Sequence, residues 1–144
     1  MRFVIVGYGR VGARTATILS TEGHEVVIVD HDEERAERAR RDGHETTEGS
    51  AADERVLERA GIGNADALAA LTSDLNANFT ACMIANSHDC RTVLRIDEDY
   101  REEIYQKYAA DVDEVVYPER MGAAGAKTAL LGGDLNVLGD LTEH

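Results

Sequence analysis

The chain has 144 residues, which is too short for two ordinary enzyme domains. Of these residues 43% are hydrophobic and 30% are charged, a composition typical of one compact globular domain. Acidic residues outnumber basic ones by 28 to 15, and the formal net charge of −13 argues against a nucleic-acid-binding surface. No apolar run approaches the roughly 18 residues that would cross a membrane, and no signal peptide follows Met1, so we expect a cytoplasmic protein.

The basic residues are almost all arginines. Only Lys107 and Lys127 are lysines, so Arg supplies the rest of the 15 basic residues. A low lysine content together with an excess of carboxylates is typical of proteins from salt-loving archaea. The acidic surfaces of such proteins stay hydrated, and molar salt screens the repulsion between their carboxylates. We expect a halophilic archaeal source, and an ordinary acidic protein from a GC-rich bacterial genome is the alternative.

Cysteine and histidine form no evident cluster in the sequence. Cys82 and Cys90 are the only cysteines, they make no Cys-X-X-Cys pair, and no histidine lies nearby at zinc-ligand spacing. We therefore expect buried free thiols. The five histidines are scattered along the chain, so the sequence predicts no metal site and no nucleophilic active site.

Apolar runs rich in β-branched residues alternate with segments of helical period. The expected strands are residues 2–6, 25–30, 44–48, 65–71, 91–96 and 113–117. The expected helices are residues 10–22, 32–41, 53–61, 74–87, 98–109 and 118–131. Six strand–helix repeats predict an α/β fold in which a parallel sheet carries helices on both faces.

The ends of these elements carry residues with suitable backbone preferences. Gly23 and Gly43 follow the first two helices, where a positive φ is needed, and Asp53 and Asp74 stand at expected N-caps. Pro118 falls in the first turn of the last helix, where its missing N–H costs least.

We expect one domain over residues 1–133. Residues 134–144 are rich in glycine and acidic side chains and lack a helical period. They are interpreted as the start of a linker to a C-terminal domain that this chain does not include.

Three glycines follow the first strand and open the first helix. Gly7, Gly9 and Gly12 form the pattern GxGxxG in the context that predicts dinucleotide binding. The first allows a tight turn, the second lets the backbone approach a pyrophosphate, and the third lets helix and strand pack closely. The fold class is therefore a Rossmann-like doubly wound parallel sheet of about six strands, with a C-terminal crossover helix.

Asp30 ends the second strand, 18 residues after Gly12, where dinucleotide-binding domains place a carboxylate that accepts the ribose hydroxyls. Its charge would repel a 2′-phosphate, so we expect NAD(H) or an adenine nucleotide such as ADP or ATP in preference to NADP(H). The neighbouring His31 is included in the predicted cofactor-binding set. The alternative is a glycine turn beside an N-cap aspartate.

Arg10 stands in the first turn of the first helix, where a cation opposes the helix dipole. Either it pairs with a nearby carboxylate, or it reaches a phosphate of the ligand. Physical reasoning leaves both alternatives open.

Six stretches of the sequence carry a resemblance to a known family. They are GYGRVG, VVIVD, GSA at residues 49–51, LTSDLNAN, RTVLRI and DEVVYPERMGA. Together they resemble the N-terminal nucleotide-binding domain of the RCK family, regulators of potassium conductance that include the TrkA-N domains of Trk and Ktr potassium-uptake subunits. The resemblance extends from Met1 to Gly133.

The resemblance implies roles for the first half of the site. Its phosphate loop would consist of Gly7, Tyr8, Gly9, Arg10, Val11 and Gly12, with Arg10 aimed at a phosphate. Asp30 would hold the adenosine ribose, and Ser50 with Ala51 would lie against the adenine. The family usually has Gly-Asp-Ala at this last position, so one carboxylate beside the base is missing here.

Further site residues are expected after the fourth and fifth strands. Those after the fourth are Thr72, Ser73, Asp74 and Asn76, at the edge where open α/β sheets bind ligands. The alternative is N-capping by Asp74 with solvated asparagines, which we favour for Asn78. Arg95 resembles an arginine at the mouth of the family's site. Glu119 corresponds to a glutamate near the phosphates and a divalent cation in relatives, although complementing the helix dipole is its commoner role.

The last expected helix is rich in small residues over positions 122–126. In the resembled family this helix crosses to a partner subunit, which implies a homo-oligomer, a dimer or a larger ring. The alternative is that the small residues only let the helix pack on its own sheet.

The resemblance implies a regulatory subunit, not an enzyme. It would bind the nucleotide, gate a potassium transporter or channel, and lie at the inner face of the membrane through that partner. Two alternatives remain: the cofactor-binding half of an NAD-dependent dehydrogenase cut from a longer chain, and a binding module for another membrane protein such as an antiporter. Against the dehydrogenase, no His, Lys or Tyr after the fourth strand has a recognisable catalytic spacing.

Overall fold

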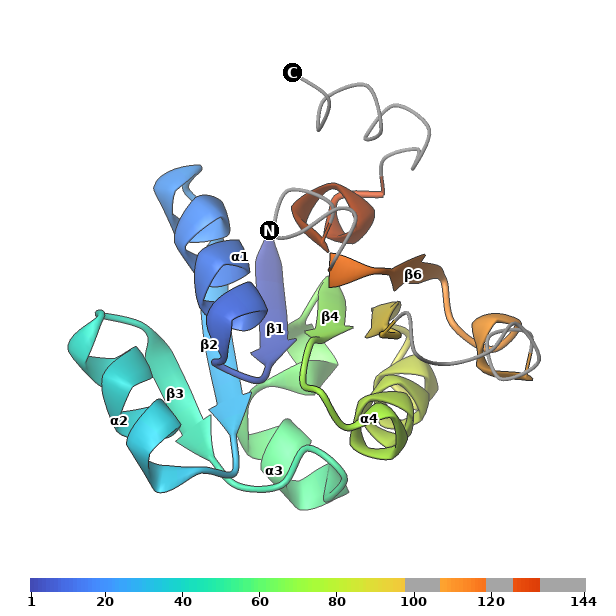
Figure 1. Ribbon diagram of the computed structural model, residues 1–144, viewed down its shortest axis with the longest axis horizontal. Coiled ribbons are helices and arrows are strands. Elements are labelled where there is room, and N and C mark those ends of the chain that lie inside the picture. Colours follow the sequence, from blue (N-terminus) through green and yellow to red (C-terminus); the bar gives the residue numbers. More distant parts are fainter. Residues whose placement is uncertain (98–106, 119–125, 133–144) are drawn as a thin grey trace.

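A computed structural model describes residues 1–97, 107–118 and 126–132 of the chain. The described residues form a parallel six-stranded sheet with the order β3-β2-β1-β4-β5-β6 (Figure 1). This order is typical of doubly wound sheets: the chain adds β2 and β3 on one side of β1, and then returns to add β4, β5 and β6 on the other side. The strands are β1 (Arg2–Val6), β2 (Glu25–Asp30), β3 (Glu45–Glu48), β4 (Ala67–Ala70), β5 (Arg91–Arg95) and β6 (Glu114–Val116).

The helices follow the strands as the sequence predicts. They are α1 (Arg10–Thr21), α2 (Glu33–Arg41), α3 (Glu54–Arg59) and α4 (Leu75–Ser87), with the short 3-10 helix η1 (Ile62–Asn64) after α3. The predicted α/β class and Rossmann-like parallel sheet are confirmed. The 3-10 helix was not predicted. Within the described residues, positions 107–109, Pro118 and 126–130 of the last two expected helices are helical.

The central strands are buried on both faces, which is why they are apolar without alternation. In β1, Val4 and Val6 belong to the core beneath α3 and α4. Phe3 and Ile5 point the other way, into a second core with α1, α2 and residues 126–130. The sheet is therefore the middle layer of three.

The expected ends of the helices are also confirmed. Gly23 and Gly43 have φ of 90° and 91°, and the carboxylates of Asp53 and Asp74 accept hydrogen bonds from backbone N–H groups in the first turns of α3 and α4. Among the described residues, none of the helices combines the length and the hydropathy of a membrane-spanning segment.

The two cysteines are buried free thiols, as predicted. Burial raises the pKa of both, that of Cys90 to about 12. Both thiols are therefore protonated and unreactive at neutral pH.

The described part of the last helix packs on the chain's own sheet. Ala126, Ala129 and Leu130 are fully buried in the core that contains Phe3. The Lys127 ammonium lies 2.7 Å from the carboxylate of Glu22 just past α1. Most of the small residues lie outside the described residues, as do positions 133–144.

Strand β1 and helix α1 are joined by an unusually close contact. A Cβ atom on Gly12 would lie 1.8 Å from the carbonyl oxygen of Gly7, a distance that no rotamer change could relieve because the neighbour is backbone. Gly63 in η1 is different, since no atom lies within 4 Å of its Cβ position and its φ is not positive.

We expect Gly12→Ala to lower the free energy of unfolding by about 1–3 kcal/mol or more, because the helix must move away from the strand. Urea unfolding of the purified chain measures this change, with Gly63→Ala as the matched control expected near zero. Equal stability of the two variants would contradict the close contact.

Candidate functional site

The carboxyl ends of the strands surround a cavity of about 220 Å³. The carboxyl ends of strands β1 to β5 contribute residues to it, and the strand order reverses between β1 and β4 at its centre. The lining residues are Val6, Gly7, Gly9, Val29, Asp30, His31, Arg35, Gly49, Ser50, Ala51, Leu71, Thr72, Ser73, Asp74, Ala77 and Arg95. The cavity therefore brings together predicted site residues from five separate segments of the sequence, one after each of the strands β1 to β5.

The glycine loop forms one wall of this cavity. Gly7 has a φ of 97°, and its N–H donates to the carbonyl oxygen of Val29, so the loop turns sharply after β1. A side chain at Gly7 would also come within 2.9 Å of Thr72 Cγ2. No atom lies within 4 Å of the Cβ position of Gly9, which leaves the backbone there open to a ligand.

The amino end of α1 differs from those of the other three described α-helices. Its N-cap is Gly9, with no side-chain hydrogen bond, and its first turn contains no acidic residue. Helices α2, α3 and α4 each begin with an aspartate that accepts from a first-turn N–H group. Among the described residues, no side chain therefore caps the first N–H groups of α1 beside the cavity, an arrangement suited to an anion.

Arg10 is exposed and forms no hydrogen bond or ion pair with any residue in the described part of the chain. Pairing with a local carboxylate, one of the two alternatives, is therefore not observed there. The side chain does not line the cavity. It is a free cation at the first position of the uncapped helix.

Asp30 is the most buried ionisable residue among those that line the cavity, with 3% of its surface exposed. Its Oδ2 atom accepts from the Tyr8 N–H at 2.7 Å and the Arg35 Nε–H at 3.0 Å, and its Oδ1 atom accepts from the Asp32 N–H at 2.9 Å. Burial alone would raise the pKa of Asp30, but these donors outweigh burial and the net effect lowers it. The carboxylate is therefore ionised at neutral pH.

Arg35 is a site residue that the sequence analysis missed. It lines the cavity and occupies one acceptor position of Asp30, so only part of that carboxylate is free for ribose hydroxyls. Arg35 also neutralises Asp30, which reduces the repulsion of a 2′-phosphate expected from Asp30 alone. The partners are five residues apart in a strand and a helix, so helical spacing gave no signal for the pair.

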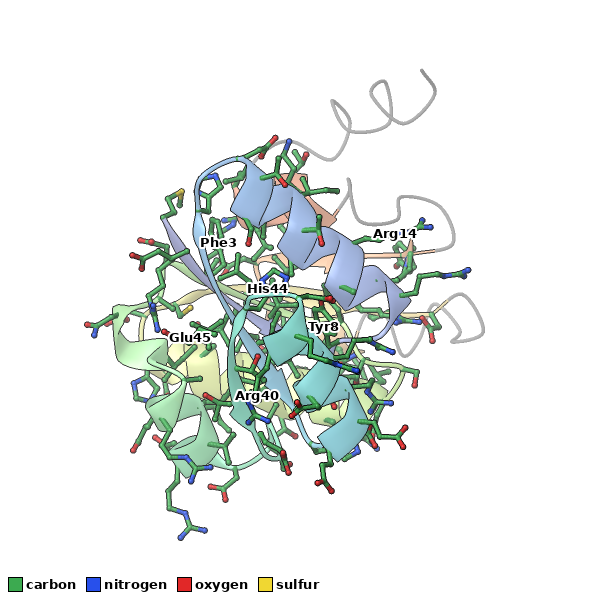
Figure 2. The ribbon with its side chains drawn as sticks, turned by 90° about the vertical axis from the view of Figure 1, so that its left-hand side faces the viewer. Phe3, Tyr8, Arg14, Arg40, His44 and Glu45 are labelled. Atoms are coloured by element: carbon green, nitrogen blue, oxygen red, sulfur yellow. The ribbon has the colours of Figure 1, made fainter. Side chains whose placement is uncertain are left out.

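Tyr8 contributes its backbone to the site, and its side chain lies elsewhere. The hydroxyl donates to Asp42 at 2.5 Å, and the ring packs edge-on against His44 beneath α2 (Figure 2). Burial, followed by the bond to Asp42, raises the pKa of this hydroxyl. The side chain fastens α2 to the glycine loop, while the backbone N–H orients Asp30.

The predicted adenine wall lies at the end of β3. Gly49, Ser50 and Ala51 line the cavity, and the N–H of Gly49 donates to the carbonyl oxygen of Asp30. The Ser50 hydroxyl accepts from the Ala52 N–H at 3.2 Å, which orders the turn before α3.

Asn78 corrects the sequence analysis. It was expected to be solvated, but it is 1% exposed and binds Thr72 through both ends of its amide. Its Oδ1 accepts from the Thr72 N–H and hydroxyl, and its Nδ2 donates to the Thr72 carbonyl oxygen and, at 3.4 Å, to that of Arg95. Asn78 therefore holds the loop after β4 against the end of β5. Asp74 caps α4, as its alternative role predicted, and also lines the cavity.

The remaining predicted residues have different positions. Arg95 lines the cavity, but Asp97 and the carbonyl oxygen of Leu71 hold its guanidinium. Like Tyr8 and Arg10, three further predicted residues do not line the cavity: Val11, Gly12 and the exposed Asn76. Glu119 lies outside the described residues.

Comparison with known proteins identifies the family to which the chain is similar. The sequence model of the TrkA-N domain matches residues 3–118. The Trk system potassium uptake protein TrkA homolog of Pyrococcus abyssi is 39% identical over 129 residues, which cover 85% of this chain and 57% of that protein. The chain thus spans little more than half the length of this relative.

Two solved structures have a similar fold. The Shewanella denitrificans Kef CTD in AMP-bound form has a TM-score of 0.69 at 24% identity, covering 99% of this chain and 91% of that chain. The GsuK channel bound to NAD has a TM-score of 0.67 at 21% identity, covering 80% and 21%. At these identities the likeness concerns the fold alone.

The sheet order and the cavity at the strand reversal define a Rossmann-like α/β domain. The chain belongs to the TrkA-N domain family, which confirms the resemblance found in the sequence.

We expect Asp30→Asn to lower the free energy of unfolding at pH 7 by about 1–3 kcal/mol, because an amide nitrogen would face N–H donors and Arg35 would lose its partner. The folded-state pKa of Asp30 is lowered, so its contribution is present above the unfolded pKa and is lost as pH falls through the folded one. Urea unfolding at pH 7 and in acid measures both effects.

The control for this comparison is Asp111→Asn, which changes an exposed aspartate. Its effect should stay within about 0.5 kcal/mol at pH 7. The account is wrong if Asp30→Asn is no more destabilising than the control, or if its effect is the same in acid as at neutral pH.

Proposed function

We propose that the cavity binds an adenine nucleotide, NAD(H) or alternatively ADP or ATP, and that the chain is the nucleotide-sensing domain of a potassium-transport regulator. The observation that carries the first part is the uncapped amino end of α1, which opens on the cavity beside Gly9. A phosphate would accept from the first-turn N–H groups and complement the helix dipole.

The size and lining of the cavity favour the adenosine part of the ligand inside it. A volume of about 220 Å³ is below the roughly 300 Å³ at which ligand pockets usually begin, so the rest of a dinucleotide would extend outward. We assign the base to the wall of Ser50 and Ala51, the ribose to Asp30, and the phosphates to α1.

Arg10 is assigned to the phosphates. It is an unpaired cation within the described chain, and it stands where a helix dipole alone would disfavour a positive charge. A phosphate bound at the same helix end would supply the missing anion. Its neighbour Arg14, one turn further along α1, is also exposed and offers a control (Figure 2).

The regulatory role rests on the relatives. The Pyrococcus abyssi relative is named as a potassium uptake protein, and the GsuK structure is a channel bound to NAD. We propose that this chain, without catalytic activity, acts on a potassium transporter or channel at the cytoplasmic face of the membrane. A C-terminal domain beyond residues 134–144 would complete the regulator, since the chain spans only part of its relative.

The proposed mechanism is a shift between arrangements of subunits. A nucleotide that binds one arrangement better than another changes their populations by no more than its difference in affinity. We propose a homo-oligomer whose contact involves the small residues of the last helix. We also propose that Glu119 lies near the phosphates.

Isothermal calorimetry of the purified chain with NAD, NADH, ADP and ATP tests the site. We expect Arg10→Ala to weaken binding roughly 10- to 100-fold, the effect of losing a charge-assisted hydrogen bond worth about 1.5–3 kcal/mol. Arg14→Ala removes the same charge from the same helix and should leave the affinity nearly unchanged. Equal losses of affinity in the two variants would contradict a direct contact between Arg10 and the phosphates, because any positive charge on α1 would then have the same effect.

The dehydrogenase alternative has its own assay. Full-length gene product incubated with NADH and a panel of ketones, or with NAD and hydroxy acids, should give no turnover. Oxidation or reduction of the cofactor in this assay would reject the sensor function while leaving nucleotide binding intact.

A further inference from the structure

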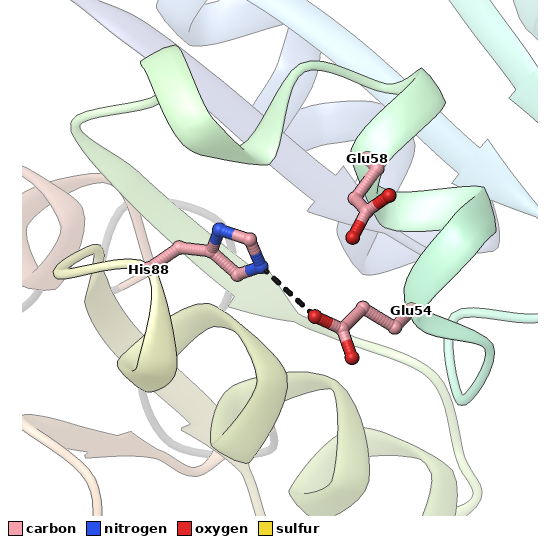
Figure 3. Close-up of side chains that lie close together, drawn as sticks. All are labelled: Glu54, Glu58 and His88. Atoms are coloured by element: carbon pink, nitrogen blue, oxygen red, sulfur yellow. Dashed lines mark hydrogen bonds and ion pairs between the residues drawn. The ribbon is translucent and has the colours of Figure 1, made fainter.

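A set of potential metal ligands lies away from the nucleotide cavity. Glu54 and Glu58 lie on α3, and His88 is the C-cap residue of α4 (Figure 3). The sequence analysis expected no metal site because the histidines are scattered, but the fold joins residues 34 positions apart. We propose that these three side chains bind a divalent transition-metal ion, for which Zn²⁺ is the suitable probe.

The distances are close to those that one ion requires. One ligand atom from each residue can be chosen so that all three lie within 4.8 Å of one another, and His88 Nε2 is 3.3 Å from Glu54 Oε1. Around zinc, with bonds of about 2.0–2.2 Å, tetrahedral ligand atoms lie roughly 3.4 Å apart. In Figure 3 the imidazole and both carboxylates face a common space. Small rotations of the two glutamates would therefore suffice.

The backbone holds the ligands in position. Glu54 and Glu58 are four residues apart, which places them on the same face of α3. The end of α4 is fixed by Asp89, at a φ of 59°, and by hydrogen bonds from Asp89 to the Asn86 carbonyl oxygen and from Cys90 to that of Ala85. These bonds form a Schellman motif, which orders the backbone on which His88 is carried.

The charges also favour a cation. Within the described residues neither Glu54 nor Glu58 pairs with a lysine or an arginine, and Arg55 pairs instead with Asp53. Two carboxylates at this spacing repel each other, and a divalent ion would remove that repulsion. An imidazole nitrogen in the set favours zinc or a similar transition metal over Mg²⁺ and Ca²⁺. Water would complete the coordination.

The site would clamp two helices that flank the nucleotide cavity. The turn before α3 carries Ser50 and Ala51, and α4 begins beside Ser73 and Asp74. Metal bound between α3 and α4 would stabilise the folded chain by linkage, whether or not a nucleotide is present.

Competition of the purified, tag-free chain with a chromophoric zinc chelator tests the proposal. We expect one saturable site and a thermal midpoint that rises with Zn²⁺ but not with Mg²⁺. Since loss of an outer-shell partner alone costs about 10- to 100-fold in affinity, His88→Ala and Glu58→Gln should each weaken Zn²⁺ binding at least about tenfold. Glu58→Gln is the safer of the two for folding, because Glu58 is exposed and its side chain has no partner in the described chain.

The matched control is Glu34→Gln, an exposed helical glutamate outside the cluster, which should bind Zn²⁺ like the wild type. Circular dichroism checks that each variant is folded. Absence of Zn²⁺ binding, or equal affinity in the wild type, His88→Ala and Glu58→Gln, would overturn the proposal and leave only the hydrogen-bond contact between His88 and Glu54.

Discussion

The close packing of α1 against the end of β1 is the constraint on which the rest of the molecule depends. Gly12 touches the carbonyl oxygen of Gly7 so closely that no side chain fits between helix and strand. The helix therefore begins directly at the carboxyl edge of the sheet, next to the point where the strand order reverses. Because Gly9 cannot cap it, the positive end of the helix dipole is left facing the cavity.

Other polar side chains around the cavity already form hydrogen bonds within the protein. Asp30 accepts three hydrogen bonds from its own chain, and Asn78 uses both ends of its amide to fasten the loop after β4. In the described part of the chain no buried side-chain nitrogen or oxygen atom lacks a partner. The ribose of the proposed nucleotide would therefore compete with Arg35 for Asp30, whereas its phosphate would meet N–H donors that no side chain of the described residues caps. We therefore expect the phosphate end to be the principal source of affinity.

The backbone of this domain was more predictable from the sequence than its side-chain contacts. The buried central strands are apolar on both faces, α2, α3 and α4 begin at an aspartate, and α1, α2 and α3 are followed by a glycine with positive φ, so most of these elements carry a local signal. The 3-10 helix after Gly61 lacked such a signal. It depends on a single left-handed glycine that also ends a short helix.

The side-chain contacts that were missed are nonlocal. Asn78 lies on the buried stripe of α4, three residues after Leu75 and four before Cys82, so the helical period separates it from the exposed Asn76. That period does not indicate its hydrogen-bond partners, the backbone groups of Thr72 and Arg95. Arg35 reaches from a helix to the end of a strand, and His88 meets Glu54 across two helices. The fold brings these pairs together, and spacing along the chain does not indicate them.

The central claim, that α1 receives the phosphates of a nucleotide, is tested most directly by amide hydrogen exchange with and without saturating ADP or NAD. The account predicts slower exchange on nucleotide binding for the amides of residues 10–12, the first of α1, with little change in β6. Unchanged exchange at these amides, under conditions where calorimetry detects binding, would contradict it.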